Sequence, residues 1–122
     1  MTNEEYIQNV LRTESPKFKS QNERLMHGIC GCVTEAGEMM DNFKRATFYR
    51  DGLLDENNLI EEMGDMLWYL AVMCDTLGCT FEALMELNIQ KLRIRYPDKE
   101  FQTESALNRD LEKERKVFDE TA

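Results

Sequence analysis

Two short acidic motifs of the same form constrain this chain more than any other feature. Residues 34–38 read Thr-Glu-Ala-Gly-Glu, and residues 61–65 read Glu-Glu-Met-Gly-Asp. Each contains two carboxylates three residues apart, so on a helix both lie on one side, one turn apart. Each also has a glycine before its second acid, which costs a helix roughly 1 kcal/mol relative to alanine. The repetition predicts two helices, with something approaching the backbone closely at Gly37 and Gly64.

Helical geometry, at about 100° per residue, relates these acids to the apolar face of each helix. The first helix has an apolar stripe of Leu25, Cys32, Ala36, Met39 and Phe43. The second has a stripe of Leu59, Met63, Met66, Leu70 and Leu77. If the helices pack through these stripes, four carboxylates converge at the rim of one core: Glu35, Glu38, Glu62 and Asp65. A hard divalent cation bound through oxygen would relieve their repulsion.

Capping residues and helix breakers predict an all-α fold, a bundle of four to five helices. The expected helices span about 2–14, 20–46, 55–77, 80–96 and 105–121. A chain of this length suits a single domain, 1–122, with a core at about 20–101 and a C-terminal helix at about 105–121. The middle of the helix at 55–77, residues 66–74, is apolar nearly all round, so we expect a second subunit to cover Trp68. The chain is then expected to oligomerise through its core helices.

Charge and hydropathy exclude several functions. A formal net charge of −9 argues against sequence-independent binding to nucleic acid or to an anionic membrane. It leaves room for an anionic small molecule, because a few placed cations and a metal can override it locally. The acidic start of the chain and the short apolar run at residues 66–74 predict a cytoplasmic protein without a signal peptide.

Cations on two helices are candidates for phosphate binding. Asn88, Lys91 and Arg95 follow one another at i, i+3 and i+7 beside an apolar stripe. Alone they fit solvated surface equally well, whereas beside an acidic metal site they favour a clamp for phosphate oxygens. Lys44 either complements the C-terminal dipole of its helix or contacts phosphate.

Three other residues have ordinary interpretations. His27, the chain's single histidine, is interpreted as a hydrogen-bonded surface or core residue and not as a ligand. Phe18 is interpreted as a packing residue in preference to a lid over a ligand. Arg109 is interpreted as solvated.

Three hypotheses compete at this point. The first is a magnesium-dependent hydrolase acting on a polyphosphate. The second, a di-iron bundle, requires Glu-x-x-His pairs, which this chain lacks, and is set aside. The third is a non-catalytic helical interaction module whose acids are merely surface. Two acid pairs with the same internal glycine and the same rotation favour the first.

Three segments together resemble a known family. They are Thr34 to Glu38, Glu61 to Leu70, and Asn88 to Leu92 followed by Arg95-Tyr96-Pro97. In order and spacing they resemble the MazG-like nucleoside triphosphate pyrophosphohydrolases of the all-α NTP-pyrophosphatase superfamily, over about residues 20–101. The resemblance is greatest to short single-domain members, including those carried by phages.

The resemblance implies hydrolysis of a nucleoside or deoxynucleoside triphosphate to the monophosphate and pyrophosphate, by a homodimer or homotetramer. It implies Mg²⁺, with Mn²⁺ as an alternative, bound by Glu35, Glu38, Glu62 and Asp65. Asn88 and Lys91 would contact the triphosphate, and Arg95 would assist. Glu38 or Glu61 would position the attacking water, although Glu61 fits a surface role equally well. Alarmone or diphosphate hydrolysis is the alternative reaction, and no residue fixes the base.

Overall fold

A computed structural model describes residues 1–119, which form six α-helices and no strand. The helices are α1 (Asn3–Leu11), α2 (Gln21–Tyr49), α3 (Glu56–Leu77), α4 (Phe81–Arg95), α5 (Thr103–Leu107) and α6 (Leu111–Asp119). The all-α prediction is confirmed. The prediction of four to five helices is too low, because the expected C-terminal helix is two helices.

The break between α5 and α6 has a local cause. Asn108 leaves the helical conformation, with φ −112° and ψ 66°, and ends α5. Two residues later the side chain of Asp110 accepts a hydrogen bond from the backbone N–H of Lys113 at 3.0 Å, which caps the start of a new helix. The last residues of the predicted 105–121 helix lie outside the described residues.

Capping residues begin and end the other helices largely where the sequence predicts. Thr2 and Glu5 form a reciprocal capping box on α1. The side chains of Ser20 and Asp55 accept hydrogen bonds from the third residues of α2 and α3. Gly78 ends α3 in the left-handed region, with φ 67°, a conformation that glycine adopts at little cost.

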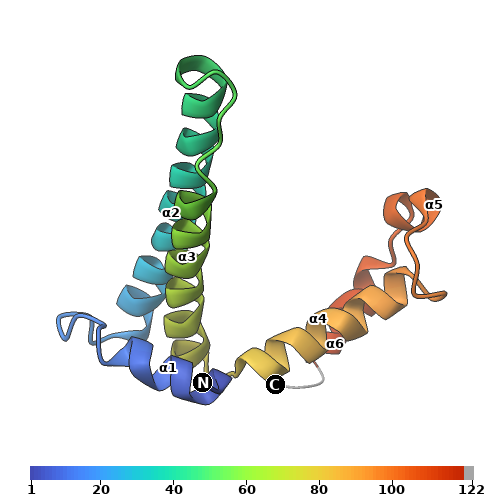
Figure 1. The fold of residues 1–122 in the computed structure, drawn as a ribbon. Helices are drawn as coiled ribbons and strands as arrows, with labels where there is room; N and C mark the ends of the chain where they lie inside the picture. The colour runs from blue at the N-terminus through green and yellow to red at the C-terminus, as the bar shows by residue number, and fades with distance from the viewer. Residues whose placement is uncertain (120–122) are drawn as a thin grey trace. The chain divides into compact units, whose positions relative to one another are not determined.

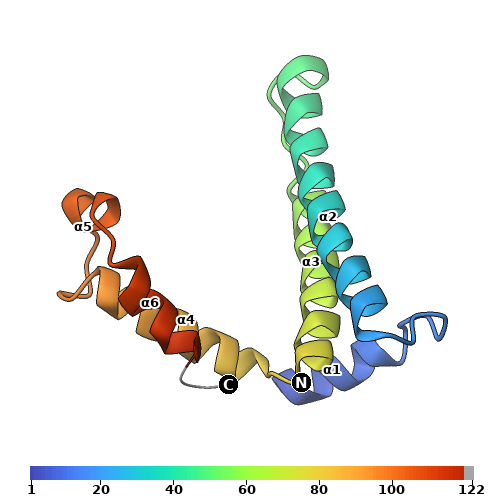
Figure 2. The ribbon, with the colours of Figure 1, turned by 180° about the vertical axis from the view of Figure 1, so that it is seen from behind.

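The chain divides into two compact units, Met1–Thr80 and a second unit that begins at Phe81. In the first, α2 and α3 run antiparallel and side by side, and α1 lies across the end where α2 begins and α3 ends (Figures 1 and 2). In the second unit, α4 packs along α6. No helix within residues 1–119 has both the length and the apolar character that a membrane crossing requires.

Small residues, and not the predicted apolar stripes, bring α2 and α3 together. Gly28, Gly31 and Ala46 of α2 are buried. At the two glycines the side chains of Met73 and Tyr69 of α3 occupy the space that a Cβ would need. This close approach puts the glycine face of α2 inward, so the predicted apolar stripes are only partly covered.

Exposure of the predicted stripes supports this correction. Phe43 on α2 is 58% exposed, and Met63 and Leu77 on α3 are 62% and 56% exposed. The expectation of a close approach at Gly37 and Gly64 is also wrong within the chain, because a Cβ at either position would meet nothing within 4 Å. The close contacts are at Gly28 and Gly31 instead.

The environment of Trp68 also differs from the expectation. Its indole Nε1 donates a hydrogen bond to the hydroxyl of Thr13 at 2.8 Å. Thr13 follows α1, which packs against α3. The chain's own N-terminal segment therefore contacts the residue that a second subunit was expected to cover.

Candidate metal and substrate site

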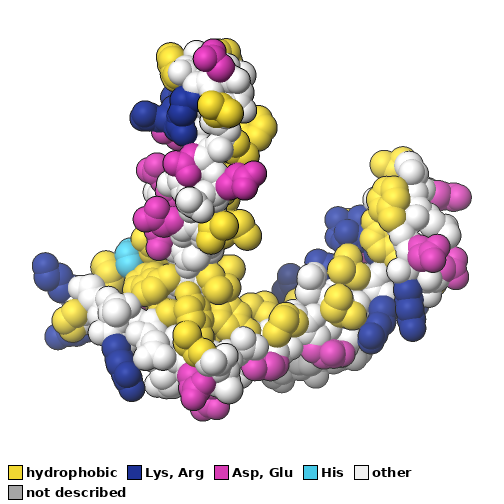
Figure 3. Space-filling view, in the orientation of Figure 1, with side chains coloured by type: hydrophobic (Ala, Val, Ile, Leu, Met, Phe, Trp, Pro, Cys, Tyr) yellow, Lys and Arg dark blue, Asp and Glu magenta, His cyan; other side chains and the backbone are white. Residues whose placement is uncertain are grey.

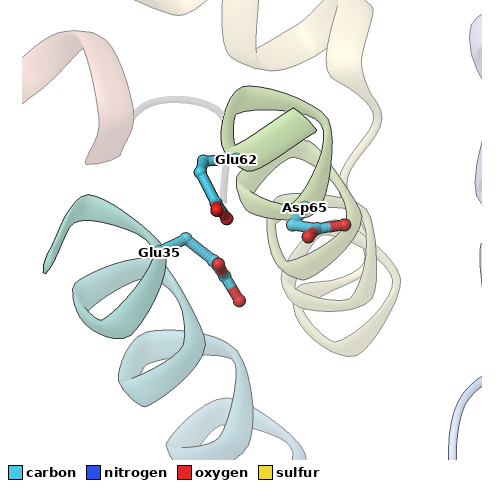
Figure 4. Close-up of side chains that lie close together, drawn as sticks. All are labelled: Glu35, Glu62 and Asp65. Carbon is cyan, nitrogen blue, oxygen red and sulfur yellow. The ribbon is translucent and has the colours of Figure 1, made fainter. Parts of the chain in front are cut away.

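Three of the predicted acids come together between α2 and α3. Glu35 of α2 and Glu62 and Asp65 of α3 each offer a carboxylate oxygen, and these oxygens all lie within 4.8 Å of one another. Figure 4 shows Glu35 and Glu62 pointing toward each other from the two helices. Glu62 is 9% exposed. Glu62 is therefore buried between the helices, whereas Glu35 is half-buried and Asp65 is exposed.

Two asparagines fix the position of Glu62. Asn58, one turn earlier on α3, donates a side-chain hydrogen bond to Glu62 Oε1 at 2.9 Å. Asn42 of α2 is 3% exposed. Its amide donates to the carbonyl of Asp55 at 2.8 Å and accepts from the Asp55 N–H at 3.3 Å. This pair of bonds joins α2 to the start of α3. It therefore fixes the position of Glu62 along the hairpin relative to Glu35.

Sequence reasoning did not identify either asparagine. Asn42 follows Glu35 by seven residues, which places both on one helix face. A polar amide two turns from an acid, on the face that carries the acid, is the signal that could have identified it.

Burial and the close acids raise the pKa of Glu35. Burial raises the pKa of Glu35, and the hydrogen bond with Glu62 raises it further, followed by the charges of Asp65, Glu62 and Glu38. A carboxylate hydrogen-bonded to another carboxylate requires a shared proton or a cation. Oxygen ligands alone, from three close carboxylates, suit a hard divalent cation such as Mg²⁺. The donor set therefore fits the predicted metal.

The other predicted acids and Lys44 do not belong to this cluster of three carboxylates. Glu38 is exposed and is not among the three acids whose oxygens meet, although its charge acts on Glu35. Glu61 is exposed on α3. The ammonium of Lys44 lies 3.2 Å from Asp41 on the same helix. Their parts in catalysis or binding stay predictions.

The predicted phosphate-binding residues lie on α4 in the second unit. Asn88 is exposed and Lys91 is half-buried. Arg95 makes two hydrogen bonds to the carboxylate of Glu114 on α6, at 3.1 and 2.9 Å. Roles in substrate binding stay predictions for all three.

Glu114 is a buried ionic centre that the sequence did not reveal. It is 3% exposed and also accepts from Arg109, with the shorter contact at 2.6 Å. Bonds from Arg95 and then Arg109 lower the pKa of Glu114 to about 2. Arg109 itself stays exposed, as the sequence analysis expected, while it makes this ion pair.

A pocket of about 310 Å³ adjoins the acids. It is lined by His27, Glu35, Asp65, Trp68 and Tyr69. Burial, followed by the negative charges of Glu35 and Asp65, raises the pKa of the Tyr69 hydroxyl. Figure 3 shows acidic side chains along the α2–α3 hairpin next to a patch of hydrophobic side chains. The site therefore combines a charged part with an aromatic part.

His27 belongs to the aromatic part. Its ring stacks on Phe18 with centroids 4.5 Å apart, so Phe18 packs against a residue of the pocket. The Nδ1 atom of His27 is buried without a hydrogen-bond partner among the described residues. The expectation of a hydrogen-bonded histidine fails at this atom, and the ring is held by packing.

Fold and site together define an all-α protein in which a helical hairpin presents three close carboxylates beside an aromatic pocket. Residues 21–100 match the MazG nucleotide pyrophosphohydrolase domain, and the chain belongs to this family. Every predicted site residue lies within the matched segment. Membership implies nucleotide pyrophosphohydrolase activity in general terms.

The chain is also similar to the Gene 37 protein of Mycobacterium phage L5. The two are 32% identical over 76 residues, which cover 60% of this chain and 67% of the phage protein. No solved structure matches the chain significantly.

Proposed function

We propose that this protein hydrolyses a nucleoside or deoxynucleoside triphosphate to the monophosphate and pyrophosphate in a Mg²⁺-dependent reaction. The observation that carries the proposal is the convergence of Glu35, Glu62 and Asp65 within 4.8 Å, inside the segment that matches the family. A pyrophosphohydrolase with such a site must bind the negatively charged phosphates of its substrate close to its own carboxylates. Only a site with a cation can do so without strong repulsion.

Glu35, Glu62 and Asp65 would hold the metal, and Glu38 is the proposed fourth ligand from α2. When bound, Mg²⁺ would balance the charge of the phosphates and lower the pKa of a water molecule. Mn²⁺ is an alternative ion, because it also favours oxygen ligands. Asn58 supports this set by holding one oxygen of Glu62, which fixes the direction of the other.

The chain's other polar residues have proposed roles in the same reaction. Glu38 or Glu61 accepts the proton of the attacking water, since both are exposed carboxylates on the two metal-binding helices. Asn88 and Lys91 bind phosphate oxygens, with assistance from Arg95 on the same helix and from Lys44 on α2. A neutral amide and ammonium groups suit a polyanion, because they donate hydrogen bonds and offset its charge.

We also propose that the protein is a homodimer or homotetramer built on the outward face of the hairpin. Exposed apolar side chains follow a spacing of three, four or seven residues on α2 and of three or four on α3: Met26, Ile29, Val33, Met40 and Phe43 on α2, and Ile60, Met63, Leu67 and Leu70 on α3. This is the spacing of helices that pack in bundles. A second copy presents the same pattern, so the face is self-complementary.

Sedimentation equilibrium tests the assembly. We expect two or four times the 14.4 kDa mass of the chain, and dissociation by Leu67→Glu, which puts a charge on the face. The exposed site at Glu112 provides a control in Glu112→Lys. A wild-type protein that stays monomeric at micromolar concentration contradicts the proposal.

Product analysis tests the reaction. The protein is incubated with the four deoxynucleoside triphosphates and the four ribonucleoside triphosphates in Mg²⁺, and pyrophosphate and orthophosphate are measured separately. We expect pyrophosphate and the monophosphate in equal amounts, with loss of both products in Glu62→Gln. Glu112→Gln, at an exposed acid remote in sequence from both motifs, serves as the matched control.

Other outcomes identify the alternatives. Orthophosphate without pyrophosphate would indicate a different phosphohydrolase, such as one acting on a diphosphate or an alarmone. Release of neither product, by a folded protein that binds Mg²⁺, would favour a non-catalytic interaction module.

A further inference from the structure

We propose that the pocket beside the acids holds the base of the substrate, and that the N-terminal segment before residue 21 sets the shape of this pocket. The inference rests on the proposed function, because it assumes a nucleotide with its phosphates at the acids. It adds the part of the protein that selects the base. The lining of the pocket lies inside the segment that matches the family, whereas the N-terminal residues proposed to shape it lie before that segment.

The chemistry of the reaction limits where the base can be. Release of pyrophosphate breaks the bond between the α-phosphorus and the oxygen that bridges to the β-phosphorus. The α-phosphate is esterified to the sugar, so the base lies only one sugar ring away from the reacting phosphorus. Glu35 and Asp65 belong both to the acid cluster and to the lining of the pocket. A nucleotide with its α-phosphate at the cluster therefore has its base within reach of the pocket.

The remaining walls of the pocket are aromatic rings at steep angles. Trp68 and Tyr69 have ring centroids 5.0 Å apart and an interplanar angle of 83°. His27 meets them at 83° and 77°, with centroids 6.0 and 5.4 Å away. A planar base can lie on the face of one ring and meet the edge of another, the two arrangements that aromatic pairs prefer. Such walls suit a heteroaromatic ring better than a phosphate chain.

His27 supplies a polar contact in this aromatic part. A proton on its buried Nδ1 would be an unpaired donor away from water, which is costly. A tautomer with its proton on Nε2 avoids that cost. We therefore expect His27 to act as a hydrogen-bond donor and to favour bases with an acceptor, a carbonyl oxygen or an unprotonated ring nitrogen, on the edge that meets it.

The N-terminal segment holds these rings in place. The hydroxyl of Thr13 accepts the indole hydrogen bond of Trp68 at 2.8 Å. Phe18 stacks on His27 with centroids 4.5 Å apart and planes 29° from parallel. Thr13 and Phe18 both precede the segment that matches the family. Selection of the base would thus depend in part on residues that lie outside the matched segment.

Trp68 is the chain's single tryptophan, so its fluorescence reports directly on the pocket. The experiment titrates the intact protein, in the presence of Mg²⁺, with each of the four deoxynucleoside monophosphates and with inorganic phosphate, and corrects for absorption with free tryptophan amide. We expect saturable quenching by at least one monophosphate and none by inorganic phosphate. Pyrophosphate release is measured on the same proteins with the corresponding triphosphates.

Two variants and a matched control test the roles of the residues. Phe18→Ala removes the stacking on His27, and His27→Ala removes the donor. We expect each to weaken the binding of the preferred monophosphate by about tenfold or more, the scale of one lost stacking or hydrogen-bonding contact. We also expect KM to rise more than kcat falls, with a smaller spread of kcat/KM among bases. Phe48→Ala, at a phenylalanine that is 73% exposed, should change neither quantity.

The outcomes separate this inference from the proposed function. Quenching without any pyrophosphate release would leave the pocket assignment standing and overturn the proposed reaction. Pyrophosphate release without quenching, or with Phe18→Ala and His27→Ala both equal to Phe48→Ala in binding and base preference, would overturn the pocket assignment alone. Circular dichroism confirms that each variant keeps its helices, and Phe18→Leu replaces any variant that does not.

Discussion

The ring of Tyr69 on α3 lies directly against Gly31 on α2, in space that any side chain at residue 31 would need. This one contact serves both parts of the site. It lets the two helices approach closely enough for Glu35 and Glu62 to meet, and it fixes the ring that forms a wall of the neighbouring pocket. Gly31 therefore determines the geometry of a site whose ligands it does not touch.

The contact makes Gly31→Ala destabilising although alanine favours helices. Overpacking a close contact costs about 1–3 kcal/mol, whereas the gain in helix propensity is at most about 1 kcal/mol. We expect a net loss of roughly 1 kcal/mol in the free energy of unfolding, measured by urea denaturation, together with a lower kcat/KM. Gly37→Ala is the matched control, because nothing lies within 4 Å of its Cβ position. Destabilisation there would reveal a close partner outside the single chain.

Asp65→Asn should separate stability from activity. Removing one charge from three close carboxylates relieves repulsion, so we expect the metal-free protein to gain about 0.5–1 kcal/mol of stability. The same change should abolish pyrophosphate release and remove the rise in melting temperature that Mg²⁺ gives the wild type. Thermal unfolding with and without MgCl₂ measures both effects. A variant that loses its fold instead would show that Asp65 is a structural acid.

Asn42→Ala should loosen the hairpin at the end where α3 begins. It leaves both backbone groups of Asp55 without their partner, at a cost of about 1–3 kcal/mol. We expect that loss in the free energy of unfolding and weaker binding of Mg²⁺ by calorimetry, because Glu62 moves relative to Glu35. Asn57→Ala changes an exposed residue of the same type and should have little effect. Equal results for the two would mean that the hydrogen bonds of Asn42 do not set the site.

Glu114→Gln should destabilise the second unit in a way that depends on pH. The arginines lower the pKa of Glu114 from an unfolded value of about 4.5 to about 2. The ionised carboxylate therefore stabilises the fold above about pH 4.5, by about 3 kcal/mol, and this contribution is lost as the pH falls toward 2. We expect the variant to be less stable than wild type at pH 7 and equal to it near pH 2, in denaturation curves at both values. A difference independent of pH would assign the effect to packing.

Lys91→Ala tests the phosphate clamp proposed for α4. An ammonium that contacts phosphate oxygens but not the metal should affect the affinity for substrate, so we expect KM for the preferred triphosphate to rise about tenfold or more. Binding of Mg²⁺ without substrate should stay unchanged in calorimetry. Lys113→Ala, at an exposed lysine on α6, is the control. Unchanged kinetics in Lys91→Ala would remove this residue from the substrate site.

The acid cluster could be predicted from the sequence because its geometry is local. Two carboxylates three residues apart have a fixed relation on any helix, so the convergence of Glu35, Glu62 and Asp65 required only that two such helices be neighbours. The face through which they pack could not be predicted in the same way. The apolar stripe that contains Phe43 has the same sequence pattern whether it packs within its own chain or against another copy. The face of α2 that carries Gly28 and Gly31 can be identified as the packing face only when Tyr69 and Met73 are known to lie opposite it.

Long-range polar pairs escaped prediction for a related reason. Glu114 and Arg109 occur among many charged residues near the end of the chain, where a solvated surface is the ordinary interpretation. Only the packing of α6 on α4 makes that carboxylate buried and brings Arg95 to it. The pocket beside the acids also depends on Thr13 and Phe18, which carry no motif that distinguishes them from other loop residues.

The bond between Arg95 and Glu114 also decides where this protein can be shortened. Arg95 lies inside the segment that matches the family, which ends at residue 100, whereas its carboxylate comes from a helix beyond that limit. A fragment that ends with the matched segment would keep Arg95 but lack Glu114, its ion-pair partner. It would also expose the side of α4 that packs against α6. The segment that matches the family is therefore shorter than the smallest fragment that we expect to fold as the whole chain does. A fragment of residues 21–100 alone should be unstable when expressed.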